Sequence, residues 1–348
     1  NVDLRCGTLA DTSLAGHSAM GVSRRLSIQP RKEVSGLMLL EVTAIKARSS
    51  GVKSFELRSV QGGPLPRFAP GAHVRITIPE LASGDNTRAY SLVSDPLDLD
   101  RYEVAVLHVQ PGNGGSAWMH ASLQPGDVLE VSEPRNDFRL EASDTHSTLI
   151  AGGIGITPIL SLVREIVRLG SSFEVHYVGR GADRMPYIPE LLAMAGGNVR
   201  LYFGRRELNL SSVIQPGRRD AHYYVCGPHA LIEGVRHEVA QAGISASQLH
   251  FEAFGYRRQT EDREAEVELR ASGLTLPLKP GRPLLEAIEM AGGWIPADCR
   301  KGECGTCISN IVEGEVDHRD HCLSPEQRKS MMCPCVSWPV TDKLILDI

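Results

Sequence analysis

The sequence predicts a multidomain chain: an antiparallel β-barrel, then an α/β domain on a parallel sheet, then a small α+β domain. Three observations carry this prediction. Short alternating strand patterns fill residues 36–143, apolar strand cores alternate with helical patterns over residues 144–258, and a cluster of cysteines marks residues 263–348. At 348 residues the chain has room for two or three domains, each with its own hydrophobic core.

Residues 1–35, ahead of the barrel, are predicted to be a disordered leader or linker. They contain scattered small and polar residues, no apolar signal-peptide core and no initiating Met. A disordered leader, an expression remnant and the end of a linker from a larger polypeptide all fit this composition.

The barrel prediction, residues 36–143, depends on regularly spaced strands. Residues 37–42, 52–57 and 102–107 alternate as strands do, and Pro70-Gly71 and Pro125-Gly126 mark turns between them. No long helical pattern interrupts the segment. Such spacing is typical of a small antiparallel barrel.

One strand of this barrel carries candidate binding residues. Period-2 alternation places Arg88 and Tyr90 on one face, beside Ala89 and Ser91. A flavin would fit there, with Tyr90 against the ring and Arg88 as a forked donor to phosphate. Taken alone, an Arg-x-Tyr strand is more often a surface pair.

A second segment of the barrel offers groups for the same phosphate. Gly114 and Gly115 could contribute backbone amides, and Ser116 a hydroxyl.

The α/β prediction, residues 144–258, depends on alternating patterns. Strand cores at 148–151, 173–178, 199–203 and 222–225 alternate with helical stretches, as in βα units on a parallel sheet. A helix is expected from near His229. The charge-dense stretch 256–268 reads as an interdomain linker.

Two turns of this domain suit a dinucleotide. Gly153, Gly155 and Thr157 lie in a Gly-rich run that follows a predicted strand and opens a predicted helix, which is a favourable place for a pyrophosphate. The run Cys226-Gly227-Pro228 also ends a strand and precedes a helix. Either turn alone could be a simple tight turn, but together they should open on one crevice beyond the strand ends.

Four cysteines indicate a 2Fe–2S site. Cys299, Cys304 and Cys307 are spaced Cys-x4-Cys-x2-Cys, and 27 residues separate Cys307 from Cys335, as in plant-type clusters. Zinc sites usually show two Cys-x2-Cys pairs, and a disulfide framework would suit a small secreted chain, so both alternatives are weaker. Cys333 stands two residues before Cys335 and is the alternative fourth ligand.

These motifs, in this order, resemble the phthalate dioxygenase reductase family. The resemblance rests on residues 88–92, 112–116, 134–138, 152–158 and 226–228, on the cysteine loop, and on residues 315–320, and it spans roughly residues 36–348. It implies a flavin barrel, a nicotinamide domain and a plant-type ferredoxin domain. It also implies FMN rather than FAD, and NADH rather than NADPH.

The resemblance also assigns residues to the cofactors. The FMN residues would be Arg88, Ala89, Tyr90 and Ser91, with Gly114, Gly115 and Ser116 near its phosphate. The nicotinamide cleft would be lined by Gly153, Gly155, Thr157, Cys226, Gly227 and Pro228. The cluster ligands would be Cys299, Cys304, Cys307 and Cys335.

Other residues were weighed against these sites. Phe254 could shield the flavin ring, although Phe251 and Phe254 could equally be core residues. The group Asp317, His318, Asp320 and His321 could bind a metal, but a hydrogen-bonded loop that positions the domain is preferred. Cys6 and Cys322 are expected to be free thiols without a role. Arg180 and Arg184 could meet a 2′-phosphate of NADPH, although solvated surface arginines are the commoner explanation.

The implied function is electron transfer from NADH through FMN to the 2Fe–2S cluster and on to a Rieske-type oxygenase that demethylates or hydroxylates an aromatic acid. One alternative is the reductase portion of a self-sufficient haem monooxygenase, and another is a redox-sensing binding module.

Composition restricts the partners. The net charge of −5 indicates neither nucleic-acid nor anionic-membrane binding, and no apolar run reaches the ~18 residues of a membrane span. We therefore expect a cytoplasmic monomer.

Overall fold

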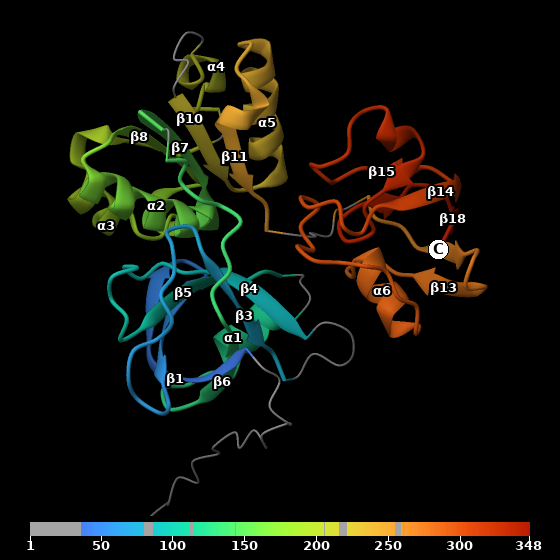
Figure 1. The fold of residues 1–348 in the computed structure, drawn as a ribbon, viewed down its shortest axis with the longest axis horizontal. Helices are drawn as coiled ribbons and strands as arrows, with labels where there is room; N and C mark the ends of the chain where they lie inside the picture. Colours follow the sequence, from blue (N-terminus) through green and yellow to red (C-terminus); the bar gives the residue numbers. More distant parts are fainter. Residues whose placement is uncertain are drawn as a thin grey trace, which may run out of the picture.

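The computed structural model describes residues 36–79, 86–110, 114–142, 144–204, 206–215, 221–254, 259 and 261–348. Figure 1 shows three domains, with the barrel and the parallel-sheet domain stacked on each other and the third domain beside them. The predicted leader, residues 1–35, and Cys6 within it lie outside the described residues.

The first domain is an antiparallel barrel, as predicted. Its elements are β1 (Leu37–Ser49), β2 (Val52–Ser59), β3 (His73–Thr77), β4 (Thr87–Ser91), β5 (Tyr102–Leu107), α1 (Gly115–Ala121) and β6 (Val128–Ser132). The strand order is β4-β3-β6-β1-β2-β5. A bridge between Leu92 and Val104 joins the two edges, so the curled sheet closes on itself.

The second domain is a parallel sheet flanked by helices, which confirms the α/β prediction. Its elements are β7 (His146–Gly152), η1 (Gly153–Gly155), α2 (Ile156–Leu169), β8 (Ser172–Val178), η2 (Ala182–Arg184), α3 (Ile188–Ala195), η3 (Gly196–Asn198), β9 (Val199–Tyr202), α4 (Leu210–Val213), β10 (Ala221–Cys226), α5 (His229–Gln241), η4 (Ala246–Gln248) and β11 (Leu249–Glu252). The strand order is β11-β10-β7-β8-β9. The strand β11 was not predicted from the sequence.

The third domain is an α+β unit. Its elements are β12 (Ala265–Leu269), β13 (Leu274–Leu278), α6 (Leu284–Met290), β14 (Ser309–Glu313), β15 (Val316–Asp317), η5 (Gln327–Lys329), β16 (Met331–Met332), β17 (Trp338–Pro339) and β18 (Lys343–Leu346). Its larger sheet has the order β13-β12-β18-β14-β16.

The predicted linker 256–268 is wrong over its last four residues, which belong to β12. Ala265, Val267 and Leu269 are buried and alternate with glutamates, so the segment is a half-buried strand with a charged outer face. The density of charge concealed this alternation. Residues 255–258 and 260 lie outside the described part of the chain.

The hydrophobic cores are distributed unevenly among the domains. One cluster joins barrel residues such as Val52 and Val93 to Leu149 and Tyr224 of the parallel-sheet domain. The third domain has a separate core that includes Leu284 and Trp338. The first two domains are thus packed as one unit.

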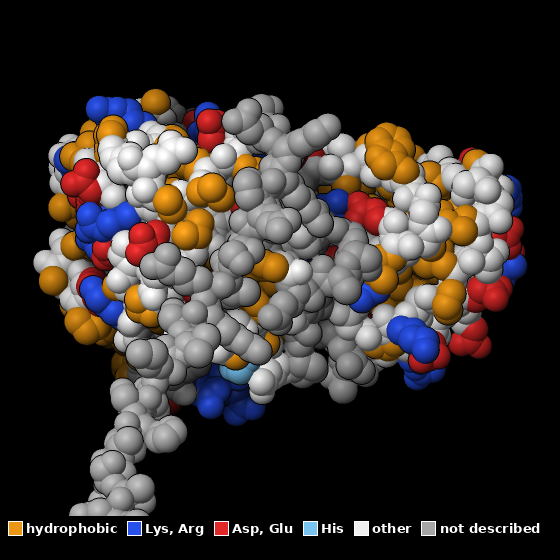
Figure 2. All heavy atoms as spheres, turned by 90° about the horizontal axis from the view of Figure 1, so that it is seen from below, with side chains coloured by type: hydrophobic (Ala, Val, Ile, Leu, Met, Phe, Trp, Pro, Cys, Tyr) orange, Lys and Arg blue, Asp and Glu red, His pale blue; other side chains and the backbone are white. Residues whose placement is uncertain are grey.

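The surface is mixed in charge. On the face in Figure 2, acidic and basic side chains are interspersed rather than gathered into one field. None of the helices in the described ranges combines the length and apolar character that crossing a bilayer requires.

Candidate functional site

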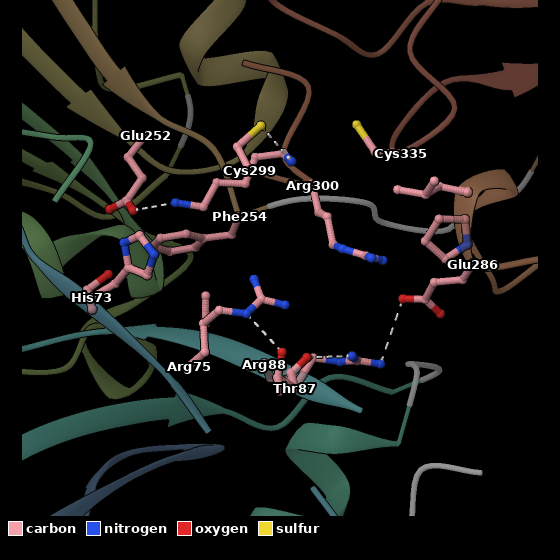
Figure 3. A pocket seen from close by; sticks show the side chains of 15 residues that line it. His73, Arg75, Thr87, Arg88, Glu252, Phe254, Glu286, Cys299, Arg300 and Cys335 are labelled. Carbon is pink, nitrogen blue, oxygen red and sulfur yellow. Dashed lines mark hydrogen bonds and ion pairs between the residues drawn. The ribbon is translucent and has the colours of Figure 1, made fainter. Parts of the chain in front are cut away.

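A pocket lies where the three domains meet (Figure 3). Strands β3 and β4 supply its floor, the end of β11 and the start of α6 supply two walls, and the cysteine loop supplies the roof. The lining residues are His73, Arg75, Thr87, Arg88, Ala89, Ser91, Glu252, Phe254, Pro283, Leu285, Glu286, Cys299, Arg300, Lys301 and Cys335.

The alternation predicted for β4 holds in the structure. Arg88 and Tyr90 pair with the buried Ile76 and Val74 of β3, so they share one face of the strand. Arg88 still reaches the lining of the pocket, whereas Tyr90 does not. Tyr90 packs against the barrel core, and burial raises its pKa to about 12.

The other face of the same strands holds two residues that sequence reasoning missed. His73 pairs with Ser91, and Arg75 pairs with Ala89, so these four residues point to the pocket side. The polar positions of β3 alternate with Val74 and Ile76, and that period was the available signal. Burial, followed by the charges of Lys301, Arg75 and Arg135, lowers the pKa of His73 to about 3.

Arg88 lies against the start of α1 and at the edge of the third domain. A Cβ on Gly115 would come within 2.9 Å of Arg88 Cγ, so only glycine allows this approach. Arg88 donates to the Thr87 carbonyl at 2.7 Å and lies 4.0 Å from the Glu286 carboxylate. Gly114 has φ of 82°, and Ser116 Oγ accepts a bond from Val109 N–H at 3.1 Å. The structure therefore brings the two predicted phosphate segments together.

The two Gly-containing turns of the parallel-sheet domain touch. A Cβ on Gly155 would lie 2.2 Å from the Cys226 carbonyl oxygen, and one on Gly227 would lie 2.9 Å from Gly152 Cα. The strands that carry these turns, β7 and β10, are paired neighbours. The turns therefore border one crevice at the carboxyl ends of the strands, where ligands bind in open parallel sheets.

Two predicted residues of this crevice are buried within it. The Thr157 hydroxyl donates to the Ile154 carbonyl at 3.0 Å and is only 2% exposed. Cys226 is fully buried, and burial raises the pKa of its thiol well above its usual value, so the thiol stays protonated. Pro228 lies against Gly152. Arg180 is exposed, and Arg184 is exposed beside Asp183.

Phe254 lies at the junction of the crevice and the pocket. It is 44% exposed and lines the pocket, so the alternative that it is a core residue is wrong (Figure 3). Phe251, three residues earlier, is half-buried in the domain core.

A buried ion pair joins the cysteine loop to β11. Lys301 Nζ lies 2.7 Å from Glu252 Oε1, and the two side chains are 8% and 2% exposed. Burial alone would lower the pKa of Lys301, but the carboxylates of Glu252 and Glu303 outweigh it and raise the pKa. Glu303 accepts a bond from Ala253 N–H at 2.5 Å, and burial raises its pKa to about 7. No sequence pattern pointed to these contacts, because they cross domains.

The four predicted cysteines converge. The Cys299 thiol accepts backbone bonds from Lys301 and Cys304, and Cys307 Sγ lies 3.3 Å from Cys335 Sγ. Gly302 and Gly305 have φ of 76° and 74°, which the tight loop requires. Cys335 lines the pocket with Cys299, whereas Cys333 Sγ lies 3.5 Å from Cys322 Sγ and also lies beside the Cys307 thiol. This donor set fits a 2Fe–2S cluster, with Cys335 as the predicted fourth ligand and Cys333 as the alternative.

The loop before Cys322 is hydrogen-bonded, as preferred from the sequence. Asp320 is fully buried and accepts bonds from the Ser337 hydroxyl and from Leu323 N–H. Arg319 pairs with Asp317 at 2.7 Å and also with Asp262. These contacts fix the loop on the core of the third domain.

The fold and these sites define a modular oxidoreductase. A family model for the 2Fe–2S iron–sulfur cluster binding domain matches residues 267–340. The beta subunit of the heme-dependent oxidative N-demethylase of Ectopseudomonas mendocina is 35% identical over 316 residues, which are 90% of this chain and 100% of that protein.

Solved structures support the same family. Phthalate dioxygenase reductase, a modular structure for electron transfer from pyridine nucleotides to [2Fe-2S], superposes with a TM-score of 0.74 at 32% identity, over 90% of this chain and 98% of that one. The chain belongs to the phthalate dioxygenase reductase family. It is an NADH-dependent oxidoreductase with FMN and a 2Fe–2S cluster, and it serves an oxygenase.

A longer protein contains the same modules. An intact self-sufficient cytochrome P450 monooxygenase superposes with a TM-score of 0.63 at 31% identity, over 90% of this chain and 41% of that chain.

Proposed function

We propose that the oxygenase partner is of the Rieske type and acts on an aromatic acid by demethylation or hydroxylation. The single observation that carries this proposal is the similarity over nearly the whole length of phthalate dioxygenase reductase. The reduction potentials typical of the two kinds of cluster are consistent with this proposal. Plant-type clusters lie near about −400 mV and Rieske centres at roughly −150 to +300 mV. A gap of at least ~250 mV favours forward transfer by about four decades at ~59 mV per decade.

Arg88, Ala89, Tyr90 and Ser91, with Gly114, Gly115 and Ser116, would hold FMN. The closeness of Arg88 to Gly115 supports this role, because it brings a guanidinium and backbone amides to one place. FMN supplies the conversion between two-electron hydride chemistry and one-electron transfer. Burial raises the pKa of Tyr90 to about 12, so its hydroxyl stays protonated.

Gly153, Gly155, Thr157, Cys226, Gly227 and Pro228 would line the nicotinamide site, and Phe254 would cover the neighbouring flavin site. The direct packing of the two turns supports this assignment. A side chain at Gly155 would push the turns apart and close the approach of the pyrophosphate to the backbone.

Cys299, Cys304, Cys307 and Cys335 would hold the cluster. Support comes from the spacing, from the 3.3 Å approach of Cys307 to Cys335, and from the glycines that let loop amides approach the sulfurs. We also propose that the chain is a monomer and that it lies in the cytoplasm, with which the absence of disulfides among the seven described cysteines is consistent.

A haem oxygenase is the second candidate partner. It is favoured by the relative whose name includes a heme-dependent N-demethylase, and by the P450 structure that contains the same modules.

Presteady-state mixing with defined acceptors decides between the candidates. The NADH-reduced protein is mixed anaerobically with a phthalate-type Rieske oxygenase and, separately, with a P450 haem domain. We expect the Rieske centre to be reduced at a catalytically competent rate and the haem much more slowly. Faster reduction of the haem would overturn the Rieske assignment. Matched experiments with NADPH should be slower than with NADH.

A further inference from the structure

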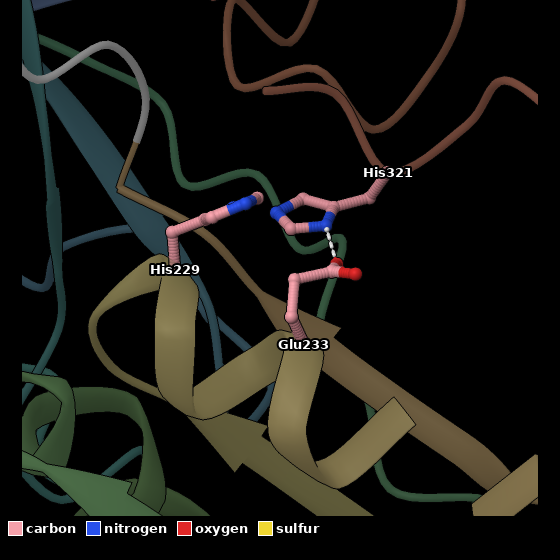
Figure 4. A group of neighbouring side chains, drawn as sticks. All are labelled: His229, Glu233 and His321. Atoms are coloured by element: carbon pink, nitrogen blue, oxygen red, sulfur yellow. Dashed lines mark hydrogen bonds and ion pairs between the residues drawn. The ribbon is translucent and has the colours of Figure 1, made fainter. Parts of the chain in front are cut away.

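Three metal-ligating side chains meet where the nicotinamide domain touches the ferredoxin domain, away from the four cluster cysteines. His229 is the first residue of α5, and Glu233 follows one helical turn later on the same face. His321 belongs to the loop after β15 in the ferredoxin domain. Figure 4 shows the three side chains pointing toward one another across the domain boundary.

The geometry is close to that of a metal site. One donor atom from each residue lies within 4.8 Å of the other two. His321 Nδ1 is 2.9 Å from Glu233 Oε1, and the two imidazole centroids are 4.9 Å apart. Tetrahedral zinc with ~2.0–2.1 Å bonds places its ligands about 3.3 Å apart. His229 is exposed, so its side chain can move by the difference.

The donor set has a recognised chemistry. Two imidazoles and one carboxylate are the protein ligands of many zinc sites that keep a fourth position open. Borderline-soft divalent ions prefer such nitrogen and oxygen donors, whereas thiolate-rich sites select softer metals. The three residues therefore offer a site chemically distinct from the nearby Asp320, Cys322 and Cys333, which also lie within 4.8 Å of one another.

The protonation states of His229 and Glu233 suit metal binding, because ligands must be deprotonated. Partial burial of the ring, and then the proximity of His321, lower the pKa of His229, so its imidazole is neutral at neutral pH. The hydrogen bond with His321 and the charge of Arg236 lower the pKa of Glu233, whose carboxylate is ionised.

One cation competes for the site. Arg236 Nη1 lies 3.4 Å from Glu233 Oε1 and 3.2 Å from His321 Nδ1. It also donates to the His321 carbonyl at 3.1 Å and stacks over the Phe251 ring at 5.5 Å. Arg236 can thus release Glu233 and His321 Nδ1 while it keeps its contacts with the His321 carbonyl and the Phe251 ring. Its charge should weaken metal binding, so its removal should strengthen binding.

We propose that His229, Glu233 and His321 form a binding site for a divalent transition metal of the zinc class, with the metal bridging the nicotinamide and ferredoxin domains. Because the ligands come from two domains, the metal binds only the docked arrangement and stabilises it by mass action. The site lies directly after Cys226-Gly227-Pro228, so the bridge joins the nicotinamide crevice to the cluster domain.

The test is calorimetric titration of the FMN- and cluster-loaded full chain with Zn²⁺. We expect one saturable site per chain. His229→Ala, Glu233→Gln and His321→Asn should each weaken it at least about tenfold, since losing even an outer-shell partner costs about that much. His237→Ala, an exposed histidine two turns further along α5, and Cys322→Ser should leave the Kd unchanged. Arg236→Met should tighten binding.

Other outcomes would overturn the proposal. These are no saturable binding, equal affinity in His229→Ala, loss of binding in Cys322→Ser, or an unchanged or weaker affinity in Arg236→Met. Zinc K-edge absorption provides an independent readout, because the proposed site has only nitrogen and oxygen ligands, and sulfur in the first shell would contradict it. His229 lies at the surface, so the His229→Ala variant should fold. Flavin and cluster spectra identical to those of the unmodified protein will check this.

Discussion

The two interfaces of this molecule are built differently. One hydrophobic cluster spans the barrel and the nicotinamide domain; it includes Val93 and Leu149, and within it Phe138 meets Tyr224 edge-on at 6.0 Å. The ferredoxin domain instead meets the other two through polar and charged contacts. Examples are Lys301 with Glu252 and His321 with Glu233.

The difference reflects what each junction must do. Hydride transfer needs reacting atoms about 3–3.5 Å apart, which a shared and closely packed core can hold. A domain that delivers electrons to a separate protein must present its cluster to that partner. Polar interfaces within a chain are typical of domains that move relative to each other.

Loss of one cluster ligand should have the largest effect, and this effect should be confined to the ferredoxin domain. Cys335→Ser should lose the visible absorption of the cluster and nearly abolish NADH-driven cytochrome c reduction. NADH should still bleach the flavin at close to the normal rate, because the barrel and nicotinamide domain keep their common core. Cys333→Ser is the matched control and should retain the cluster. If Cys333→Ser also lost the cluster, the assignment of the fourth ligand would be wrong.

Substitutions in the apolar interface should lower the unfolding free energy more than substitutions in the polar interface. Phe138 is 1% exposed in the shared core, so Phe138→Ala should cost about 3–5 kcal/mol in the unfolding free energy followed by flavin fluorescence. Leu97→Ala, at a side chain that is 62% exposed, should change it by less than about 0.5 kcal/mol. Equal effects of the two substitutions would contradict a shared core.

At the polar interface, the buried ion pair of Lys301 and Glu252 should contribute more to stability than the exposed ion pairs do. Lys301→Met leaves the Glu252 carboxylate buried without its partner and should cost about 3 kcal/mol in urea unfolding followed by cluster circular dichroism. Adding Glu252→Gln should recover most of this loss. Lys329→Met, at an exposed pair, should have an effect within about 0.5 kcal/mol. A double variant no better than the single would refute the pairing.

The smallest effect concerns pH at the junction of barrel and ferredoxin domain. His73 is neutral when folded, with a pKa of about 3, and protonates near 6.5 when unfolded. The unfolded chain therefore binds the extra proton, so stability is lost as pH falls below about 6.5. Between pH 7.5 and 5.5 this amounts to about 1.4 kcal/mol.

His73→Gln removes this titrating group and should flatten the pH dependence of unfolding by that amount. The exposed His237→Gln serves as the control and should leave the slope as it is. If the pH dependence of the unfolding free energy persisted in His73→Gln, other titrating groups would be its cause.

Local patterns predicted much of the chemistry before any fold was known. Three of the cysteines fall within nine residues, because one loop must wrap the cluster. The glycines at 153, 155 and 227 were identifiable because each follows a strand and precedes a helix; at Gly155 and Gly227 backbone approaches backbone, and at Gly153 φ is 56°. The strand β12 was not predicted, because its glutamates made the segment look like a charged linker although its buried residues alternate.

The sequence by itself determined the order of the domains, the cofactor classes and the cysteine and glycine positions, because each depends on residues close together along the chain. Only the tertiary structure decided that His73 and Arg75 border the pocket, that Lys301 pairs with Glu252, and that His229 and Glu233 meet His321. The physical reason is the same in each case. A period along the chain can place His73 and Arg75 on one face of a strand, but which surface any face meets depends on how separately folded domains dock.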